Sequence, residues 1–389
     1  MTTQHPFDLI KVERELNDEQ RAIQAVTRQY VNDRIKPDIA QWFESGEIPA
    51  RELALELGAI GLLGMHLQGY GCAGTDATSY GLANMELEAG DSGIRSLVSV
   101  QGSLAMFAIH EYGSEEQKQE WLPRMAKGQA IGCFGLTEAD FGSNPSGMLT
   151  NAKRDGVDWI LNGTKMWITN GTVADVAIIW AQTEEGIRGF VVPTNTPGFK
   201  ANLIKHKLSL RASLTAELVF DNVRLPDSAR LPLATSLRAP LMCLAEARFG
   251  IIFGTVGAAR DSFETALAYA ATREQFDGPI AKHQLTQGKL STMATDLTTA
   301  MLLALHIGKL KDANEVTAEQ ISMGKFNNAN TALEIARGCR SILGGAGITT
   351  EYSIFRHMVN LESVLTYEGT HEIHQLVIGQ ALTGISSFR

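Results

Sequence analysis

Proline is unevenly distributed along the 389 residues of the chain, and its distribution divides the chain into regions that must fold differently. Six of the 11 prolines fall between positions 145 and 240, and only Pro279 lies beyond position 240. Because proline is excluded from helix interiors and from central strands, the last part of the chain has room for long helices. The middle part must be built from shorter elements joined by turns.

The first third of the chain is expected to be helical. Asn17 and Gln20 have the spacing of a capping box, and apolar residues then recur at helical spacing until Pro37. The stretch 96–110 is almost free of charged residues, so its helix should be largely buried. Further helices are expected at 49–58 and 79–89.

Between about 131 and 235 the pattern changes to that of strands. The β-prone segments 157–161 and 164–169 are joined by Asn162-Gly163, the dipeptide that type I′ turns favour, so a hairpin is predicted there. Shorter strands are expected at 176–181, 189–192 and 217–220. These segments predict a compact, antiparallel, barrel-like β-domain.

From about 241 the composition again favours helices, and Thr317 with Gln320 forms a second capping-box pair. Amphipathic helices in this number bury their apolar faces most simply in a four-helix-type bundle. The expected helices are 241–272, 285–311, 317–338, 350–364 and 371–382. The chain is thus predicted to be mainly α with a central β-domain: an N-terminal helical domain (1–130), a middle β-domain (131–236) and a C-terminal helical bundle (237–389).

Charge and cysteine content exclude several classes of protein. A formal net charge of −9 disfavours nucleic acid as a partner, although a local basic pocket can still hold a small polyanion. The four cysteines are too far apart for a zinc site, which makes a reducing compartment the default. Without a signal-peptide core or a run of 18 uncharged apolar residues, we expect a soluble cytoplasmic protein that does not insert into membranes.

Common cofactor signatures are missing. The sequence has no GxGxxG after a strand and no GxxxxGK[ST], which argues against a Rossmann nicotinamide site or a P-loop. His371 and His374 are one residue too close for a zincin motif, so we interpret them as surface or packing histidines and expect no metal. The glycine-containing loops 134–143 and 343–347 would let backbone N–H groups approach a flavin or an anion, but each alone is more simply a turn.

Taken together, five motifs occur in the order and spacing of the acyl-CoA dehydrogenase family. They are FGLTEADFGS (134–143), MWITNG (166–171), REQF (273–276) with Gln284, LGGAG (343–347) and TYEGTH (366–371). The chain resembles this family from about residue 15 to its C-terminus. The segments GCFGLTE, SLRAS, ARFG and TYEGTHEIH most resemble its glutaryl-CoA dehydrogenase members.

The resemblance implies that Glu368 is the catalytic base, because the family carries a glutamate in a YEGT-type loop. The base removes the α-proton of an acyl-CoA thioester while hydride leaves the β-carbon for flavin N5. Apolar surroundings would raise the pKa of Glu368 to suit this task, whereas the dipole of a helix capped by Thr370 would favour the ionised form. Without the resemblance, Glu368 would be interpreted as a solvated loop acid.

Some family members place the base directly before the arginine that corresponds to Arg248. That position is Ala247 here, and the nearby Glu246 is offset by one residue. Glu368 is therefore preferred over Glu246.

Arg95 is the candidate specificity residue. It opens a stretch that stays uncharged until Glu111, although an ordinary i,i+4 ion pair with Asp91 is the simpler interpretation. The resemblance implies that Arg95 binds the distal carboxylate of the substrate beside Glu88. The remaining substrate-binding residues that it implies are Ser96, Ser99, Ser143, Arg248, Tyr367 and Gly369.

The resemblance also implies FAD as the cofactor. The ring and pyrophosphate would lie against Phe134, Gly135, Leu136, Thr137, Gly142, Ser143, Trp167, Ile168, Thr169 and Thr370. The FAD of a neighbouring subunit would be reached by Arg273, Phe276, Gln284, Ser341, Leu343, Gly344 and Gly345. The flavin site then requires at least a dimer, usually within a homotetramer of two dimers.

Three positions depart from the family pattern. Ala139 replaces a proline and Asn144 an aspartate, which should alter the rigidity of the loop more than its chemistry. Ile94 stands where glutaryl-CoA dehydrogenases commonly have tyrosine, which bears on the acyl pocket.

The function that follows is FAD-dependent oxidative decarboxylation of glutaryl-CoA to crotonyl-CoA and CO2, with electrons passed to an electron-transfer flavoprotein. One alternative is a short-chain, branched or other dicarboxylyl-CoA dehydrogenase that does not decarboxylate. A more distant alternative is a catalytically silent flavin-binding partner protein.

Overall fold

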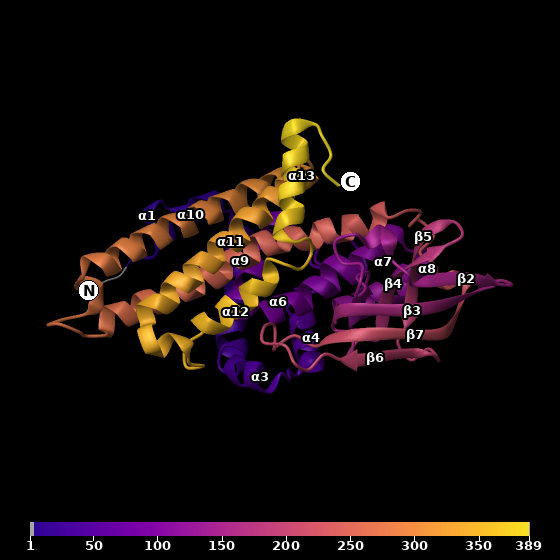
Figure 1. Ribbon diagram of the computed structural model, residues 1–389, viewed down its shortest axis with the longest axis horizontal. Coiled ribbons are helices and arrows are strands. Elements are labelled where there is room, and N and C mark those ends of the chain that lie inside the picture. The colour runs from indigo at the N-terminus through magenta and orange to yellow at the C-terminus, as the bar shows by residue number, and fades with distance from the viewer. Residues whose placement is uncertain (1–3, 389) are drawn as a thin grey trace.

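The computed structural model describes residues 4–388 and shows a helical body with a β-sheet at one end (Figure 1). The predicted capping box is present, since the Asn17 and Gln20 side chains accept hydrogen bonds from each other's backbone N–H at 2.9 and 3.0 Å. The N-terminal helices are α1 (Pro6–Leu9), η1 (Val12–Glu15), α2 (Asp18–Tyr30), α3 (Ile39–Ser45), α4 (Ala50–Ala59), α5 (Ala77–Gly90), α6 (Ser92–Ser99), α7 (Phe107–Tyr112) and α8 (Glu115–Ala126). The π-helical turns η2 (Val31–Ile35) and η3 (Val100–Met106) continue α2 and α6.

The uncharged stretch 96–110 is helical and largely buried, as its composition predicts. It runs through α6, η3 and α7, and every residue from Ser92 to Met106 is buried. An uncharged sequence can be accommodated there because neighbouring helices and the sheet enclose it on all sides.

The middle of the chain forms one seven-stranded sheet with the order β1-β4-β2-β3-β7-β6, and β5 pairs with β4. Most strand pairs are antiparallel, but β1 runs parallel to β4, and β2 makes one parallel contact with β4. The buried rings of Trp159, Phe190 and Phe220 belong to its core. The strands are β1 (Gly132–Gly135), β2 (Asn151–Asp155), β3 (Asp158–Thr169), β4 (Val176–Thr183), β5 (Gly186–Pro193), β6 (Phe199–Leu203) and β7 (Thr215–Pro226).

The predicted hairpin at Asn162-Gly163 is wrong. The chain passes straight through this dipeptide as one strand, β3, whose two halves both pair with β7. Gly163 has a φ of +138° at an irregularity in this pairing, so the glycine serves a bulge and not a turn. The hairpin turn lies earlier, at Gly156 and Val157, where β2 pairs with the first half of β3.

Residues 237–388 contain five α-helices, close to their predicted ranges, and the short 3-10 helices η6 (Ile280–Lys282) and η7 (Gly344–Ile348). The α-helices are α9 (Arg238–Thr272), α10 (Gln284–Asp312), α11 (Ala318–Leu343), α12 (Ile354–Val364) and α13 (His371–Thr383). Helix α9 is the central helix of the molecule and packs against α5 and α11. Both α9 and α10 are long and apolar enough to cross a membrane, but 72% of the apolar stretch of α9 is buried inside the protein, as in a core helix, against 44% for α10.

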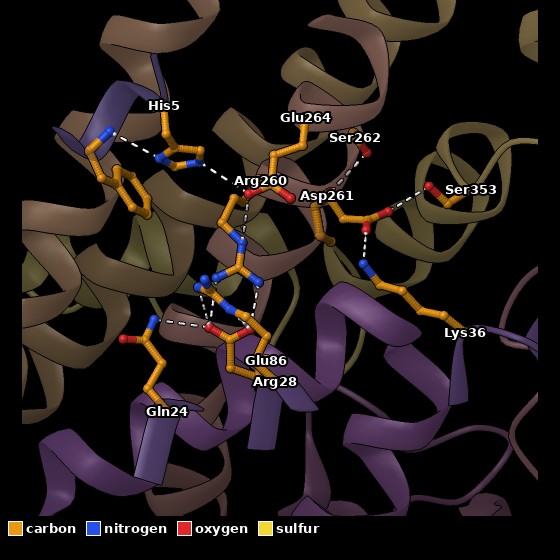
Figure 2. A network of polar contacts seen from close by, with 12 residues as sticks. His5, Gln24, Arg28, Lys36, Glu86, Arg260, Asp261, Ser262, Glu264 and Ser353 are labelled. Atoms are coloured by element: carbon orange, nitrogen blue, oxygen red, sulfur yellow. Dashed lines mark hydrogen bonds and ion pairs between the residues drawn. The ribbon is translucent and has the colours of Figure 1, made fainter. Parts of the chain in front are cut away.

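A buried polar network joins the N-terminal helices to α9 (Figure 2). The carboxylate of Glu86 on α5 accepts two hydrogen bonds of 2.6 Å from Arg260 on α9, and others from Arg28 and Gln24 on α2. One residue further along α9, Asp261 holds Lys36 at 2.6 Å, together with Ser353 and His357. The contacts of Glu86 fix α5 relative to α9. Helix α5 also carries a second glutamate, Glu88, two residues further along.

Candidate active site

Arg95 and Glu88 form a buried ion pair at the junction of α5 and α6. Arg95 Nε donates to Glu88 Oε2 at 2.7 Å, and the two side chains are only 1% and 0% exposed. The Arg95 Nη2 atom also donates to the Tyr367 hydroxyl, which comes from the loop before α13. Burial alone would lower the pKa of Arg95, but Glu88 and Tyr367 outweigh it and raise the pKa, so the guanidinium stays charged.

The simpler ion pair of Arg95 with Asp91 is not formed. Asp91 instead caps α6 by accepting from the Gly93 N–H at 2.7 Å, while its other oxygen accepts from Arg356 and Asn360 at 2.9 Å each. Helix α12 therefore satisfies Asp91, and Arg95 remains free to point toward Glu88 and Tyr367.

Glu368 occupies the loop between α12 and α13 in a left-handed backbone conformation, with a φ of +55°. Its carbonyl oxygen accepts from Arg248 Nε at 2.6 Å. The carbonyls on either side, those of Tyr367 and Gly369, accept from Lys325 Nζ at 2.5 and 2.6 Å. Two cations from α9 and α11 thus hold three successive carbonyl groups.

The Glu368 carboxyl group lies at the centre of this cluster. Its Oε2 atom is buried and has no hydrogen-bond partner within residues 4–388. Burial raises the pKa of Glu368, against the opposing charges of Arg95, Lys325 and Arg248. Thr370 does cap α13, with Oγ1 accepting from the Ile373 N–H at 3.3 Å, so the N-terminus of this helix lies two residues after Glu368.

Burial also shifts the pKa of the neighbouring ionisable groups. It lowers the pKa of Lys325 to about 7, and that of His374 to about 3. His374 lies directly behind Gly369, where a Cβ atom would come within 2.9 Å of its Nε2. His371 stacks on Phe326 with ring centroids 4.1 Å apart, and residues 4–388 contain no cluster of three or more metal-ligating side chains.

Glu246, the alternative base, is occupied elsewhere. Its Oε1 atom lies 2.6 Å from Lys311 Nζ in an ion pair that is mostly buried. Of the two candidate glutamates, only Glu368 has a buried carboxylate oxygen without a partner in the described part of the chain.

The three predicted substrate-binding serines are not equivalent. Ser96 and Ser99 are buried on α6 near Arg95, and Ser99 Oγ has no hydrogen-bond partner in residues 4–388. Ser143 lies in an exposed loop, and none of the hydrogen bonds within the described residues connects it to Arg95 or Glu368. Ser96 and Ser99 thus share the buried helix of Arg95, whereas Ser143 lies on an exposed loop of the β-domain.

The loop 134–143 is fixed beside the end of β3. Lys165 Nζ donates to the Leu136 carbonyl and to Glu138 Oε1, both at 2.9 Å, and Glu138 also accepts from the backbone of Leu149 and Thr150. The Thr137 carbonyl accepts from the Met166 N–H at 2.9 Å. These bonds bring FGLTE and MWIT side by side, although the two segments are separated in sequence.

The predicted flavin residues on these two segments differ in exposure. Trp167 is 59% exposed and has a φ of +64°, so it projects outward from the bulge of β3. Gly142 is exposed, and a Cβ atom there would have nothing within 4 Å, while Thr137 and Thr169 are half-buried. Phe134, Leu136 and Ile168 are buried, so their side chains belong to the protein core.

The second set of predicted flavin residues lies elsewhere. Leu343 is buried, whereas Arg273, Phe276, Gln284, Ser341, Gly344 and Gly345 are exposed. They lie around the α9–α10 and α11–α12 connections, at the end of the molecule opposite the sheet (Figure 1). Within one chain, the structure does not bring the two sets together.

Two features of the site escaped the sequence analysis. Lys325 is 1% exposed, and its neighbours on one helix face, Ile321, Asn328 and Ala329, are also buried. Lysine is almost never fully buried unless it has a partner, so a lysine on a helix face with these neighbours could have indicated a buried polar contact. Gly254 on α9 makes room for the ion pair, since a Cβ there would lie 2.1 Å from Glu88 Oε2.

The chain is similar to known proteins over almost its whole length. The family models of the N-terminal, middle and C-terminal domains of acyl-CoA dehydrogenase match residues 17–129, 133–223 and 237–383. Crystal structures of glutaryl-CoA dehydrogenase from Mycobacterium smegmatis, one of them in complex with FADH2, are 66% identical, with a TM-score of 0.98 and full coverage of both chains. The human mitochondrial short-chain specific acyl-CoA dehydrogenase is 34% identical over 371 residues, which cover 94% of this chain and 90% of the human protein.

The three domain models together account for most of the chain, and the relatives match it nearly end to end. The chain belongs to the acyl-CoA dehydrogenase family.

Proposed function

We propose that this protein is an FAD-dependent dehydrogenase that converts glutaryl-CoA to crotonyl-CoA and CO2. The observation that carries the proposal is the buried Arg95 guanidinium, held by Glu88 and Tyr367 next to Glu368. Arg95 Nη1 has no hydrogen-bond partner within residues 4–388, which leaves a donor for the distal carboxylate of a short diacyl thioester. The 66% identity to a glutaryl-CoA dehydrogenase supports the same substrate.

Glu368 is proposed as the general base. Its buried, unpartnered Oε2 is free to accept the Cα proton of a bound thioester, and the raised pKa brings the carboxyl group closer to the acidity of that proton. The ion pair of Glu246 with Lys311 supports this choice, because it occupies the carboxylate of the alternative base.

The residues of the β-domain loops fit FAD. The exposed Trp167 and the open, glycine-containing loop up to Ser143 offer a flat apolar face and accessible backbone, and Lys165 and Glu138 fix the loop from behind. When bound, FAD supplies a two-electron acceptor for the hydride that leaves Cβ. The FADH2 complex of the Mycobacterium smegmatis relative supports this cofactor.

The assembly and electron acceptor are part of the same proposal. The exposed set around Arg273 and Gln284 lies too far from the sheet to serve the flavin of its own chain (Figure 1), so we assign it to the flavin of a partner in a homotetramer of two dimers. Electrons would leave to an electron-transfer flavoprotein. We also place the domain divisions at 130/131 and 236/237, between α8 and β1 and between β7 and α9.

Anaerobic titration of the holoenzyme with acyl-CoA thioesters tests the substrate. Glutaryl-CoA should bleach the flavin absorbance, and turnover with an artificial acceptor should release crotonyl-CoA and CO2 in equal amounts. Bleaching by butyryl-CoA with none by glutaryl-CoA would overturn the substrate assignment. Failure of every acyl-CoA to bleach the flavin would overturn the proposed activity.

The base assignment has its own test. Removal of a positioned general base costs about 100- to 10,000-fold, so Glu368→Gln should slow flavin reduction by at least about 100-fold while flavin content is retained. Glu246→Gln is the matched control and should keep most of the activity. The reverse result would transfer the role of the base to Glu246.

A further inference from the structure

Lys325 makes an unusual set of contacts for a buried lysine. Its Nζ atom donates to two main-chain carbonyls, those of Tyr367 and Gly369, and it forms no ion pair with a carboxylate within residues 4–388. A buried ammonium group is normally compensated by a carboxylate partner. Here the compensation comes from the peptide dipoles on either side of Glu368.

These contacts hold Glu368 in a conformation that its residue type disfavours. A φ of +55° brings the Cβ atom of an L-residue close to the following carbonyl oxygen, so such residues persist only where surrounding structure imposes them. Lys325 holds the carbonyls before and after Glu368, and Arg248 holds the carbonyl of Glu368 itself. In the left-handed conformation, the Glu368 side chain reaches the same cluster as Arg95 and Tyr367.

We infer that Lys325 is a positioning residue for the catalytic base: it fixes the backbone of Glu368 and supplies a buried positive charge that favours the carboxylate form. This inference rests on the proposed function, in which Glu368 is the base. It assigns a catalytic consequence to a side chain outside the YEGT-type loop, 43 residues earlier in the chain.

Because the pKa of Lys325 is lowered to about 7, Lys325 is charged on the acidic side of neutrality, and there its charge affects the protonation of Glu368. Three cations act to lower the pKa of Glu368, while burial and one further acid act to raise it. Removing one cation takes away part of the effect that lowers the pKa of Glu368, so this pKa should rise further. The ionisable groups that act on Glu368 are Glu88 from α5, Arg95 from α6, Arg248 from α9, Lys325 from α11 and the adjoining Tyr367. His374 from α13 lies against the next residue, Gly369.

Lys325→Met, of similar length and without charge, tests the inference in the holoenzyme. Small displacements of a reacting group cost up to about 100-fold, so flavin reduction by glutaryl-CoA should slow by about 10- to 100-fold while the KM for glutaryl-CoA changes little. The acidic limb of the pH profile should move to higher pH. Lys325→Arg, which keeps the charge, should restore the position of that limb, and Lys325→Gln, which keeps a donor without the charge, should not.

Lys207→Met is the matched control. Lys207 is a half-buried lysine whose Nζ donates to two loop carbonyls, those of Leu210 and Ser213, at 2.9 and 2.6 Å, and to Thr215 Oγ1 at 2.7 Å. Its loss should leave the pH profile of flavin reduction unchanged. A wild-type rate and pH profile in Lys325→Met, or the same shift in Lys207→Met, would overturn the inference.

A structural measurement separates this inference from the proposed function. Amide hydrogen exchange in residues 366–370 should accelerate in Lys325→Met and not in Lys207→Met, whether or not any acyl-CoA is turned over. If wild-type protein reduces its flavin with glutaryl-CoA but Lys325→Met does not alter amide exchange in residues 366–370, the proposed activity is supported and the positioning role is contradicted. If no acyl-CoA reduces the flavin while exchange accelerates, Lys325 still positions the loop and the proposed activity falls.

Discussion

Gly254 on α9 lies directly against the carboxylate of Glu88 on α5. A Cβ atom at Gly254 would lie 2.1 Å from Glu88 Oε2 and 3.4 Å from Arg95 Nε. The missing side chain therefore provides the space in which the buried ion pair forms. The proposed substrate-binding residue Arg95 therefore depends on the absence of a side chain at Gly254.

Gly254→Ala should destabilise the protein and disturb the Glu88–Arg95 pair. Forcing an atom into a packed core costs about 1–3 kcal/mol, which outweighs the better helix propensity of alanine. The matched control is Gly288→Ala on α10, where nothing lies within 4 Å of the new Cβ, and it should stabilise by about 0.5–1 kcal/mol. Urea unfolding measures both, and equal stabilisation by the two substitutions would contradict the close contact.

Arg95→Met should be more damaging to stability than loss of an ordinary ion pair. It leaves the fully buried Glu88 without its cation, for which about 3–5 kcal/mol is expected. The double substitution Glu88→Gln with Arg95→Met should recover part of that loss, because no unpaired charge remains. A double-mutant cycle from unfolding curves gives the coupling, and strictly additive losses would argue against the pair.

The Glu86–Arg260 network should make stability depend on pH in the acid range. Burial opposes ionisation of Glu86, but Arg260 and Arg28 outweigh it and lower its pKa to about 2. A depressed folded-state pKa gives stability that is present above the ordinary carboxyl pKa and lost as the pH falls from about 4.5 to about 2, on the order of 3 kcal/mol. Thermal melting from pH 6 to pH 2 should show the loss.

Glu86→Gln should lower stability at neutral pH and flatten this acid dependence. Glu362→Gln, which removes an exposed partner of Arg337, is the control and should leave the curve as steep as in the wild type. Equal steepness in all three proteins would show that other carboxyl groups govern the acid unfolding.

Lys165→Met should weaken flavin retention. Lys165 ties Leu136 and Glu138 to β3, and burial lowers its pKa to about 8 while Glu138 opposes the shift. Losing a charge-assisted hydrogen bond costs about 1.5–3 kcal/mol, so the Kd for FAD should rise by about 10- to 100-fold. Flavin released on ultrafiltration measures this, with Lys207→Met as the control. Unchanged retention would mean that the loop keeps its shape without Lys165.

Much of the fold could be predicted from short-range patterns. The capping box at Asn17 and Gln20, the buried run 96–110 and the helices after position 240 follow from the spacing of apolar residues and from proline exclusion, which act over a few residues. The hairpin at Asn162-Gly163 failed for the same reason. Local turn preference favours a reversal there, but pairing of both halves of β3 with β7 keeps the strand extended.

The sequence by itself determined the order of helical and β segments and, through its motifs, the family and the candidate residues Glu368 and Arg95. Only the tertiary structure decided the partners of these residues. Arg95 meets Tyr367 across 272 positions, and Lys325 reaches the Glu368 loop from a different helix. Which distant groups become buried together depends on helix packing across the whole chain, and that burial raises the pKa of Glu368, the proposed base.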